Sequence, residues 1–177
     1  MRSACVLFAL LLAESTPPTA AAQQGACPMD SLGDSATVFR IRMRGAALAK
    51  SGRYVESLAC YQEVLRREPN DGASHMNSGM MLEILKRYPE SEREYELALP
   101  LTPNAIGRQH ILWHLGYTNA QLGQYQTALL WFQQAGDANP ADGSSWANAA
   151  VAAGRVGQDS LARVYKARAD SLRSVRP

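Results

Sequence analysis

The chain has 177 residues, of which 46% are apolar, and its formal charge is +2 at neutral pH. This length suits one ordinary domain, and the nearly balanced charge argues against the strongly basic composition typical of nucleic-acid-binding proteins. We therefore expect no nucleic acid as a partner, and nothing in the composition calls for an anionic membrane.

Residues 1–22 have the pattern of a secretory signal peptide. Arg2 precedes a short apolar run from Val6 to Ala13, and a polar stretch then ends in the small residues Ala20, Ala21 and Ala22. The apolar run is much shorter than the roughly 20 residues that span a bilayer, so we predict no stable membrane insertion. These features predict an exported protein, periplasmic or secreted, with a flexible leader over residues 23–37.

The cysteines leave three interpretations open. Loss of Cys5 with the signal peptide would leave Cys27 and Cys60, an even number in a compartment where disulfides persist. A disulfide between them would stabilise the fold by roughly 3 to 4 kcal/mol in the chain-entropy model. Alternatively, Cys60 is a small buried residue and Cys27 a free thiol. In the third interpretation Cys27 is lipidated, although Gln24 occupies a position that is normally aliphatic in a lipoprotein signal.

Two sets of landmarks reveal an internal repeat. The prolines Pro69, Pro103 and Pro140 are 34 and then 37 residues apart, and the glycines Gly45, Gly79 and Gly116 have the same two spacings. One insertion of three residues between the second and third units explains both. We expect it in a loop over residues 104–108, because Pro103 and Gly107 disfavour a helix there.

Each unit follows the same internal order. A first segment with apolar residues at helical spacing ends at a turn, and in three units a glycine that can adopt the left-handed conformation stands there: Gly52, Gly123 and Gly157. A second amphipathic segment follows and is ended by a proline in the first three units. This pattern predicts helix pairs at residues 38–71, 72–105, 109–142 and 143–177.

The units resemble tetratricopeptide repeats, whose 34-residue unit is a helix-turn-helix with small and aromatic residues at fixed positions. The residues that carry the resemblance are Gly45, Tyr54, Pro69, Gly79, Tyr88, Tyr95, Pro103, Gly116, Gly123, Tyr125, Ala128, Phe132, Pro140 and Trp146. Lys86 replaces the turn glycine of the second unit, and Ser91 replaces its small alanine. In the last unit Asp159 and Lys166 replace aromatic residues, as suits a capping helix with one face in water.

The resemblance implies an all-α fold, a right-handed superhelical solenoid of about four helix-turn-helix units. It also implies that the first helices line a concave groove. The residues expected to face this groove are Arg42, Met76, Asn77, Met80, His110, Trp113, His114, Tyr117 and Asn148. Methionine and aromatic side chains suit a surface that grips an apolar peptide or helix, although the same residues could serve packing between units.

The sequence gives no support for catalysis. It contains no nucleophile elbow, paired-cysteine zinc pattern or dinucleotide fingerprint, so we expect neither an enzyme nor a cofactor. His110 and His114 are four residues apart and could share a metal ion, but no further ligands are evident, and we expect no metal site. The predicted function is a scaffold of the cell envelope that binds a protein or peptide in the groove. The alternative is a structural subunit that associates with itself or with a larger complex through its outer helices.

Overall fold

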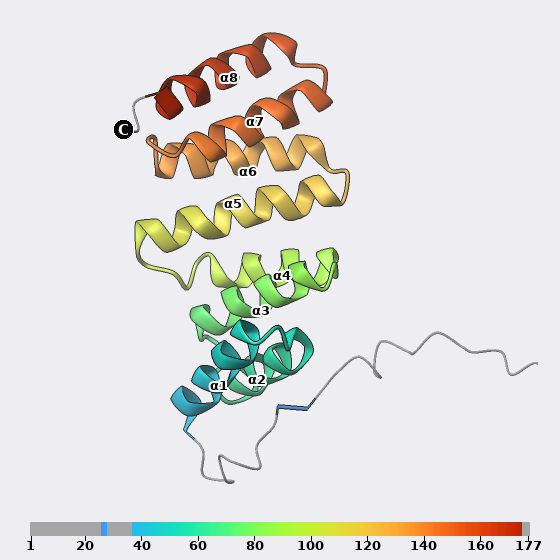
Figure 1. Cartoon of the computed structure of the whole chain (residues 1–177), viewed down its shortest axis with the longest axis vertical. Coiled ribbons are helices and arrows are strands. Elements are labelled where there is room, and N and C mark those ends of the chain that lie inside the picture. Colours follow the sequence, from blue (N-terminus) through green and yellow to red (C-terminus); the bar gives the residue numbers. More distant parts are fainter. Residues whose placement is uncertain (1–25, 28–36, 175–177) are drawn as a thin grey trace, which may run out of the picture.

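The computed structural model describes residues 26–27 and 37–174, so the predicted signal peptide and most of the predicted leader lie outside the described part of the chain. Within that part, all regular elements are helices, and they stack in chain order into one elongated array (Figure 1). The helices are α1 (Val38–Lys50), α2 (Tyr54–Arg67), α3 (Gly72–Ile84), α4 (Tyr88–Ala98), α5 (Ala105–Gln121), α6 (Tyr125–Ala138), α7 (Gly143–Arg155) and α8 (Asp159–Ser174). None of these helices is both long and apolar enough to cross a bilayer. The structure is thus the expected all-α solenoid of four helix pairs.

The same tight turn joins the two helices of every pair. In each turn the amide three residues beyond the end of the first helix donates to a carbonyl five residues earlier, as Arg53 does to Leu48 at 3.0 Å. This arrangement needs a left-handed residue, and Gly52, Gly123 and Gly157 have φ angles of 76°, 76° and 77°. Lys86 takes the same position in the second pair with φ of 59°. The turn therefore forms there without glycine, at the steric expense of a Cβ atom in the left-handed region.

Glycine on the first helix lets an aromatic ring of the second helix pack against the backbone. A Cβ atom added to Gly79 would lie 2.8 Å from the ring of Tyr95, and one added to Gly116 would lie 2.6 Å from Phe132. These distances are shorter than real Cβ contacts, so a larger residue would force the helices apart. Gly45 and Tyr61 form the equivalent contact in the first pair at 3.1 Å.

Serine fits the position on the second helix where the family pattern has a small alanine, because its buried hydroxyl donates a hydrogen bond to a backbone carbonyl of the first helix. Ser91 is fully buried on α4 and its hydroxyl donates to the carbonyl oxygen of Gly79 at 2.8 Å. Ser57 makes the same bond to Gly45 in the first pair at 2.8 Å. A buried hydroxyl with a hydrogen bond carries little penalty, which explains why Ser91 stands where the family pattern has alanine.

The insertion between units two and three lies in a helix, so the prediction of a loop at residues 104–108 is wrong. Helix α5 begins at Ala105 and has 17 residues, whereas α1, α3 and α7 each have 13. The side chain of Asn104 caps this longer helix by accepting a hydrogen bond from the Gly107 amide at 2.6 Å. Pro103 precedes the cap and so interrupts nothing, and Gly107 falls in the first turn, where Thr102 leaves no room for a Cβ atom.

The two ends of the solenoid are secured differently. At the first pair, a disulfide joins Cys27 to Cys60 on α2, and of the three interpretations of the cysteines the structure has the disulfide. At the last pair, Trp146 on α7 is almost completely buried, and its ring would lie 2.6 Å from a Cβ atom added to Gly136. The guanidinium of Arg168 on α8 covers the same ring, 3.7 Å from its centroid.

Replacing Lys86 with glycine should stabilise the protein. The left-handed conformation costs a residue with a Cβ atom about 1 to 2 kcal/mol, and part of that gain is offset by the greater freedom of glycine in the unfolded chain. We expect a net increase of about 0.5 to 1 kcal/mol in the free energy of unfolding, measured with urea. The reciprocal control is Gly123→Ala, which meets no neighbouring atom within 4 Å and should lower stability through strain alone. No gain from Lys86→Gly would show that this turn is not strained.

Replacing Gly116 with alanine should destabilise the protein despite the higher helix propensity of alanine. The new Cβ atom would meet the buried ring of Phe132, an overpacking that typically costs about 1 to 3 kcal/mol. The matched control is Gly154→Ala on α7, where no atom lies within 4 Å and stability should rise by up to about 1 kcal/mol. Urea unfolding of both variants measures the difference. Equal effects of the two substitutions would contradict the proposed role of the glycine.

Candidate functional site

Two neighbouring hollows lie between α5 and α7, the first helices of the third and fourth pairs. One has a volume of about 300 Å³ and is bordered by His110, Trp113 and His114 of α5 and by Asp142 and Ser144 at the start of α7. The other has a volume of about 370 Å³, and its lining includes Tyr117, Tyr125, Phe132, Asn148, Val151 and Arg155. Five of the nine predicted groove residues therefore line these hollows: His110, Trp113, His114, Tyr117 and Asn148.

A row of aromatic side chains on α5 connects the two hollows. Trp113 stacks on Tyr117 with 5.7 Å between the ring centroids, and it meets His114 and Phe132 edge-on at 5.2 and 6.2 Å. Trp113 and Tyr117 are half-buried and pack against the apolar cluster of α6 and α7. Burial is the main cause that raises the pKa of Tyr117, and electrostatic repulsion from Tyr88 and Glu83 raises it further. The Tyr117 hydroxyl therefore stays neutral and can donate a hydrogen bond. The row thus combines a packing role with partly accessible aromatic surface.

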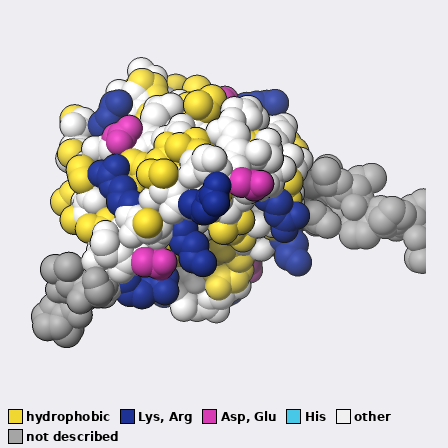
Figure 2. Space-filling model, turned by 90° about the horizontal axis from the view of Figure 1, so that it is seen from above, with side chains coloured by type: hydrophobic (Ala, Val, Ile, Leu, Met, Phe, Trp, Pro, Cys, Tyr) yellow, Lys and Arg dark blue, Asp and Glu magenta, His cyan; other side chains and the backbone are white. Residues whose placement is uncertain are grey.

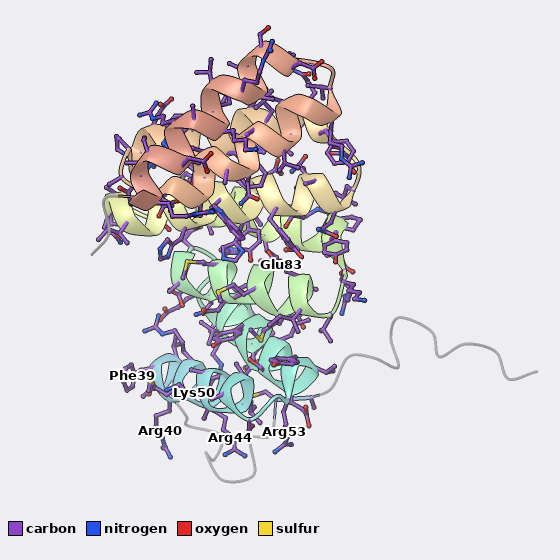
Figure 3. The ribbon with its side chains drawn as sticks, turned by 45° about the horizontal axis from the view of Figure 1, so that its top comes forward. Phe39, Arg40, Arg44, Lys50, Arg53 and Glu83 are labelled. Atoms are coloured by element: carbon purple, nitrogen blue, oxygen red, sulfur yellow. A yellow bond between two sulfur atoms is a disulfide. The ribbon has the colours of Figure 1, made fainter. Side chains whose placement is uncertain are left out.

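Glu83 joins the second and third pairs through one carboxylate oxygen. Its Oε2 accepts a hydrogen bond from His114 Nδ1 of α5 at 2.9 Å and from the Tyr95 hydroxyl of α4 at 3.2 Å. The rings of His114 and Tyr95 are stacked, with 5.1 Å between their centroids. Figure 3 shows Glu83 in the middle of the array, at the junction of these pairs. Burial and then the Glu83 charge raise the pKa of Tyr95, which keeps its hydroxyl a donor.

The other predicted groove residues lie outside the two hollows. Met76 and Met80 of α3 pack against buried clusters, and Met80 contacts both the cluster of the first two pairs and the cluster around Tyr95. Arg42 of α1 forms an ion pair with Asp71, the residue that precedes α3, at 2.9 Å. Asn77 is half-buried on α3. Arg42 and the two methionines therefore contact neighbouring pairs, and Met76 also borders a separate hollow of about 380 Å³ beside the start of α3.

The two histidines of α5 have different environments. His110 is exposed, whereas the Nδ1 atom of His114 is engaged with Glu83. In the described ranges, no group of three or more histidine, cysteine, aspartate or glutamate side chains is arranged to hold a metal ion. His114 therefore has a structural role, because it bonds Glu83 and contacts the rings of Tyr95 and Trp113.

Two residues of the site were not predicted from the sequence. Asp142 caps α7 by accepting hydrogen bonds from the amides of Ser144 and Ser145, and its Oδ2 accepts a bond from Gln109 of α5 at 3.0 Å. Arg155 lies over the ring of Tyr125, 5.4 Å from its centroid, at the far side of the second hollow. An aspartate before Gly143-Ser144-Ser145 is a helix-cap pattern and could have indicated Asp142, but no local pattern indicates Arg155.

Asp142 should make the stability of the site depend on pH. Burial alone would raise the pKa of this carboxyl, but the hydroxyl and amide donors of Ser145 and Ser144 outweigh burial and lower it below its ordinary value of 3.8. Its stabilisation is therefore complete above about pH 4 and is lost as the pH falls through the lower folded pKa. Asp142→Asn keeps a capping side chain without the titration. We expect a smaller loss of unfolding free energy between neutral pH and about pH 3 in this variant than in the parent, by urea unfolding. Identical losses would assign the acid sensitivity to other carboxylates.

Comparison with known proteins places this arrangement in a family. Two tetratricopeptide repeat models match residues 42–106 and 109–142, which together make up more than half of the chain. Protein O-mannosyl-transferase Tmtc3 of Drosophila melanogaster is 38% identical over 61 residues. That match covers 34% of this chain and only 7% of the length of the relative.

Solved structures of MamA share the fold at low sequence identity. One crystal structure of MamA superposes with a TM-score of 0.75 at 12% identity, covering 82% of both chains. The structure of MamA 41-end from Desulfovibrio magneticus RS-1 gives a TM-score of 0.72 at 20% identity, covering 80% of this chain and 78% of that one. With its repeat-model matches and its four stacked helix pairs, the chain belongs to the tetratricopeptide repeat family, whose helical arrays are scaffolds for protein interaction.

Proposed function

We propose that this protein is an exported, non-catalytic adaptor of the cell envelope that binds a peptide or a helix of another protein between α5 and α7. The observation that carries the proposal is the pair of adjoining hollows joined by the aromatic row of Trp113 and Tyr117. Aromatic side chains with a polar tip provide large contact areas at little entropic cost and dominate many protein interfaces.

The borders of the hollows can fix the orientation of a bound peptide. His110 is exposed at one side, and Asn148 and Arg155 line the other hollow. Asn148 offers amide donors and an acceptor to a peptide backbone, and Arg155 offers a positive charge. An apolar centre with polar groups at its edge is the usual composition of a peptide-binding surface.

Two features support export to an oxidising compartment. The N-terminal sequence has the signal-peptide pattern, and the disulfide between Cys27 and Cys60 is a kind of bond that persists outside the reducing cytosol. Together they favour the periplasm or the extracellular space as the place of function.

A second candidate function is that of a structural subunit that packs through its outer helices. Leu130 on α6 and Val164 on α8 are 34 residues apart, the same interval as Gly123 and Gly157, so they hold equivalent positions in successive units. Both are more than half exposed, at 51% and 61%. Exposed aliphatic side chains at equivalent positions of two second helices favour contact with another subunit on that side.

Affinity capture from an envelope extract should distinguish the two functions. The groove variant is His110→Ala with Tyr117→Ala, and the control variant is Leu130→Ala with Val164→Ala, each confirmed as helical by circular dichroism. We expect the groove variant to retain its specific partner at least tenfold less well, because aromatic hot spots typically contribute about 2 kcal/mol or more. The control variant should capture the partner as the parent does.

The reverse result would overturn the adaptor proposal. One such result is that only the Leu130→Ala, Val164→Ala variant loses its partner. Another is that sedimentation shows the parent to be self-associated and this variant to be monomeric. Either result would replace the adaptor function with the structural-subunit function.

A further inference from the structure

The first helix of the solenoid carries cations and no acidic residue. Of its four basic residues, Arg42 is neutralised by Asp71, the residue that precedes α3. Arg40, Arg44 and Lys50 take part in no ion pair within the described ranges. Figure 3 shows Arg40 and Arg44 pointing away from the body of the array at its α1 end, on the same side as Arg53 of the following turn. Arg53 itself is paired with Glu56.

Exposed apolar side chains lie beside these cations. Phe39 and Met43 are four residues apart, so they form one row along α1, and 61% and 53% of their surfaces are exposed. Arg40 and Arg44 form the adjacent row with the same spacing, and Lys50 continues the apolar row toward the end of the helix. The outer face of α1 thus presents an apolar row flanked by basic groups; we call Phe39, Arg40, Met43, Arg44 and Lys50 the α1 patch.

The face at the opposite end of the described array differs from the α1 patch because it includes acidic side chains. On α8 the cations Arg163, Lys166 and Arg173 alternate with Asp159 and Asp170 around a groove of about 690 Å³. Figure 2, which views this end, shows acidic side chains among the basic and apolar ones. Helix α8 therefore carries acidic residues among its basic ones, whereas α1 carries basic residues and no acidic one.

We propose that the α1 patch docks the protein onto the surface of an anionic lipid bilayer. Phe39 and Met43 would enter the boundary between headgroups and acyl chains, while Arg40, Arg44 and Lys50 contact lipid phosphates. A helix with an apolar row and flanking Arg and Lys binds in the plane of a membrane interface in this way.

A bilayer fits the patch better than an acidic peptide does. Hollows lie between α5 and α7, on α8, and between the start of α3 and the residues around the start of α5, whereas the patch is the projecting outer face of a terminal helix. A peptide gains affinity from a groove or from a strand edge, while a flat lipid surface needs only an exposed amphipathic face. The docking is independent of the groove: it would place the solenoid end-on, with the hollows between α5 and α7 away from the lipid.

The test is flotation of the full chain with vesicles of phosphatidylcholine alone and of an equal mixture of phosphatidylcholine and phosphatidylglycerol. The patch variant is Arg40→Gln with Arg44→Gln. The matched control is Arg163→Gln with Lys166→Gln, which removes the same charge at the opposite end. Comparison between variants cancels any contribution from residues outside the described part, and circular dichroism confirms that each variant is folded.

We expect the parent to bind the mixed vesicles, less strongly in high salt, and the patch variant to bind about 10- to 30-fold more weakly, since each cation near an anionic surface contributes about fivefold. The control should change by less than about twofold. Phe39→Ser should weaken binding without changing its salt dependence, because it removes only the apolar contact.

Three results would overturn the proposal. Equal losses in the patch and control variants would show an effect of net charge alone. Unchanged binding of the patch variant would place any lipid contact elsewhere in the chain. Binding of the parent to a polyglutamate peptide, together with no binding to the mixed vesicles, would identify an acidic protein as the partner of the patch.

Discussion

The contact between a glycine on one helix and an aromatic ring on the next is the constraint on which the solenoid depends. Where Gly79 meets Tyr95 and Gly116 meets Phe132, the absence of a side chain lets the ring reach the neighbouring backbone. This contact sets how closely the two helices of a pair approach, and therefore where the first helices stand relative to one another. The spacing between α5 and α7, and with it the shape of the hollows, depends on these contacts, and Phe132 both meets Gly116 and lines the second hollow.

Much of the fold was predictable because these contacts repeat. The shared spacing of prolines and glycines revealed the units, and the turn glycines marked the joint inside three of the four pairs. Sequence reasoning missed two places where a residue takes a structural role that its type does not favour or that its neighbours are expected to prevent. Asn104 caps a helix directly after Pro103, so the inserted residues lengthen α5. Pro103 and Gly107, which were expected to prevent a helix over residues 104–108, instead lie just before the helix and in its first turn. Lys86 shows the converse case, since the turn forms without the residue that favours it.

The site was predictable in part for a related reason. Helical periodicity could place Trp113 and Tyr117 on one face of one helix. It could not show which residues of other units meet that face. The bonds of Glu83 to His114 and of Arg42 to Asp71 join positions 31 and 29 residues apart, and they depend on how successive pairs stack. The bond of Glu83 to Tyr95 depends on how α3 and α4 pack within one pair. The distinction between groove and packing residues, such as Met80, likewise arises only from that stacking.

The disulfide has a consequence for the direction in which the array comes apart. In a linear stack each pair is supported only by its neighbours, so opening starts at whichever end is held least firmly. Cys27 and Cys60 clamp the first pair covalently, while α7 and α8 rely on noncovalent contacts such as Trp146 beneath Arg168. In an oxidising compartment fraying should therefore start from α8 and move inward. A protease would then trim the molecule from its C-terminal end first, and the α1 end would be the last part of the fold to be lost.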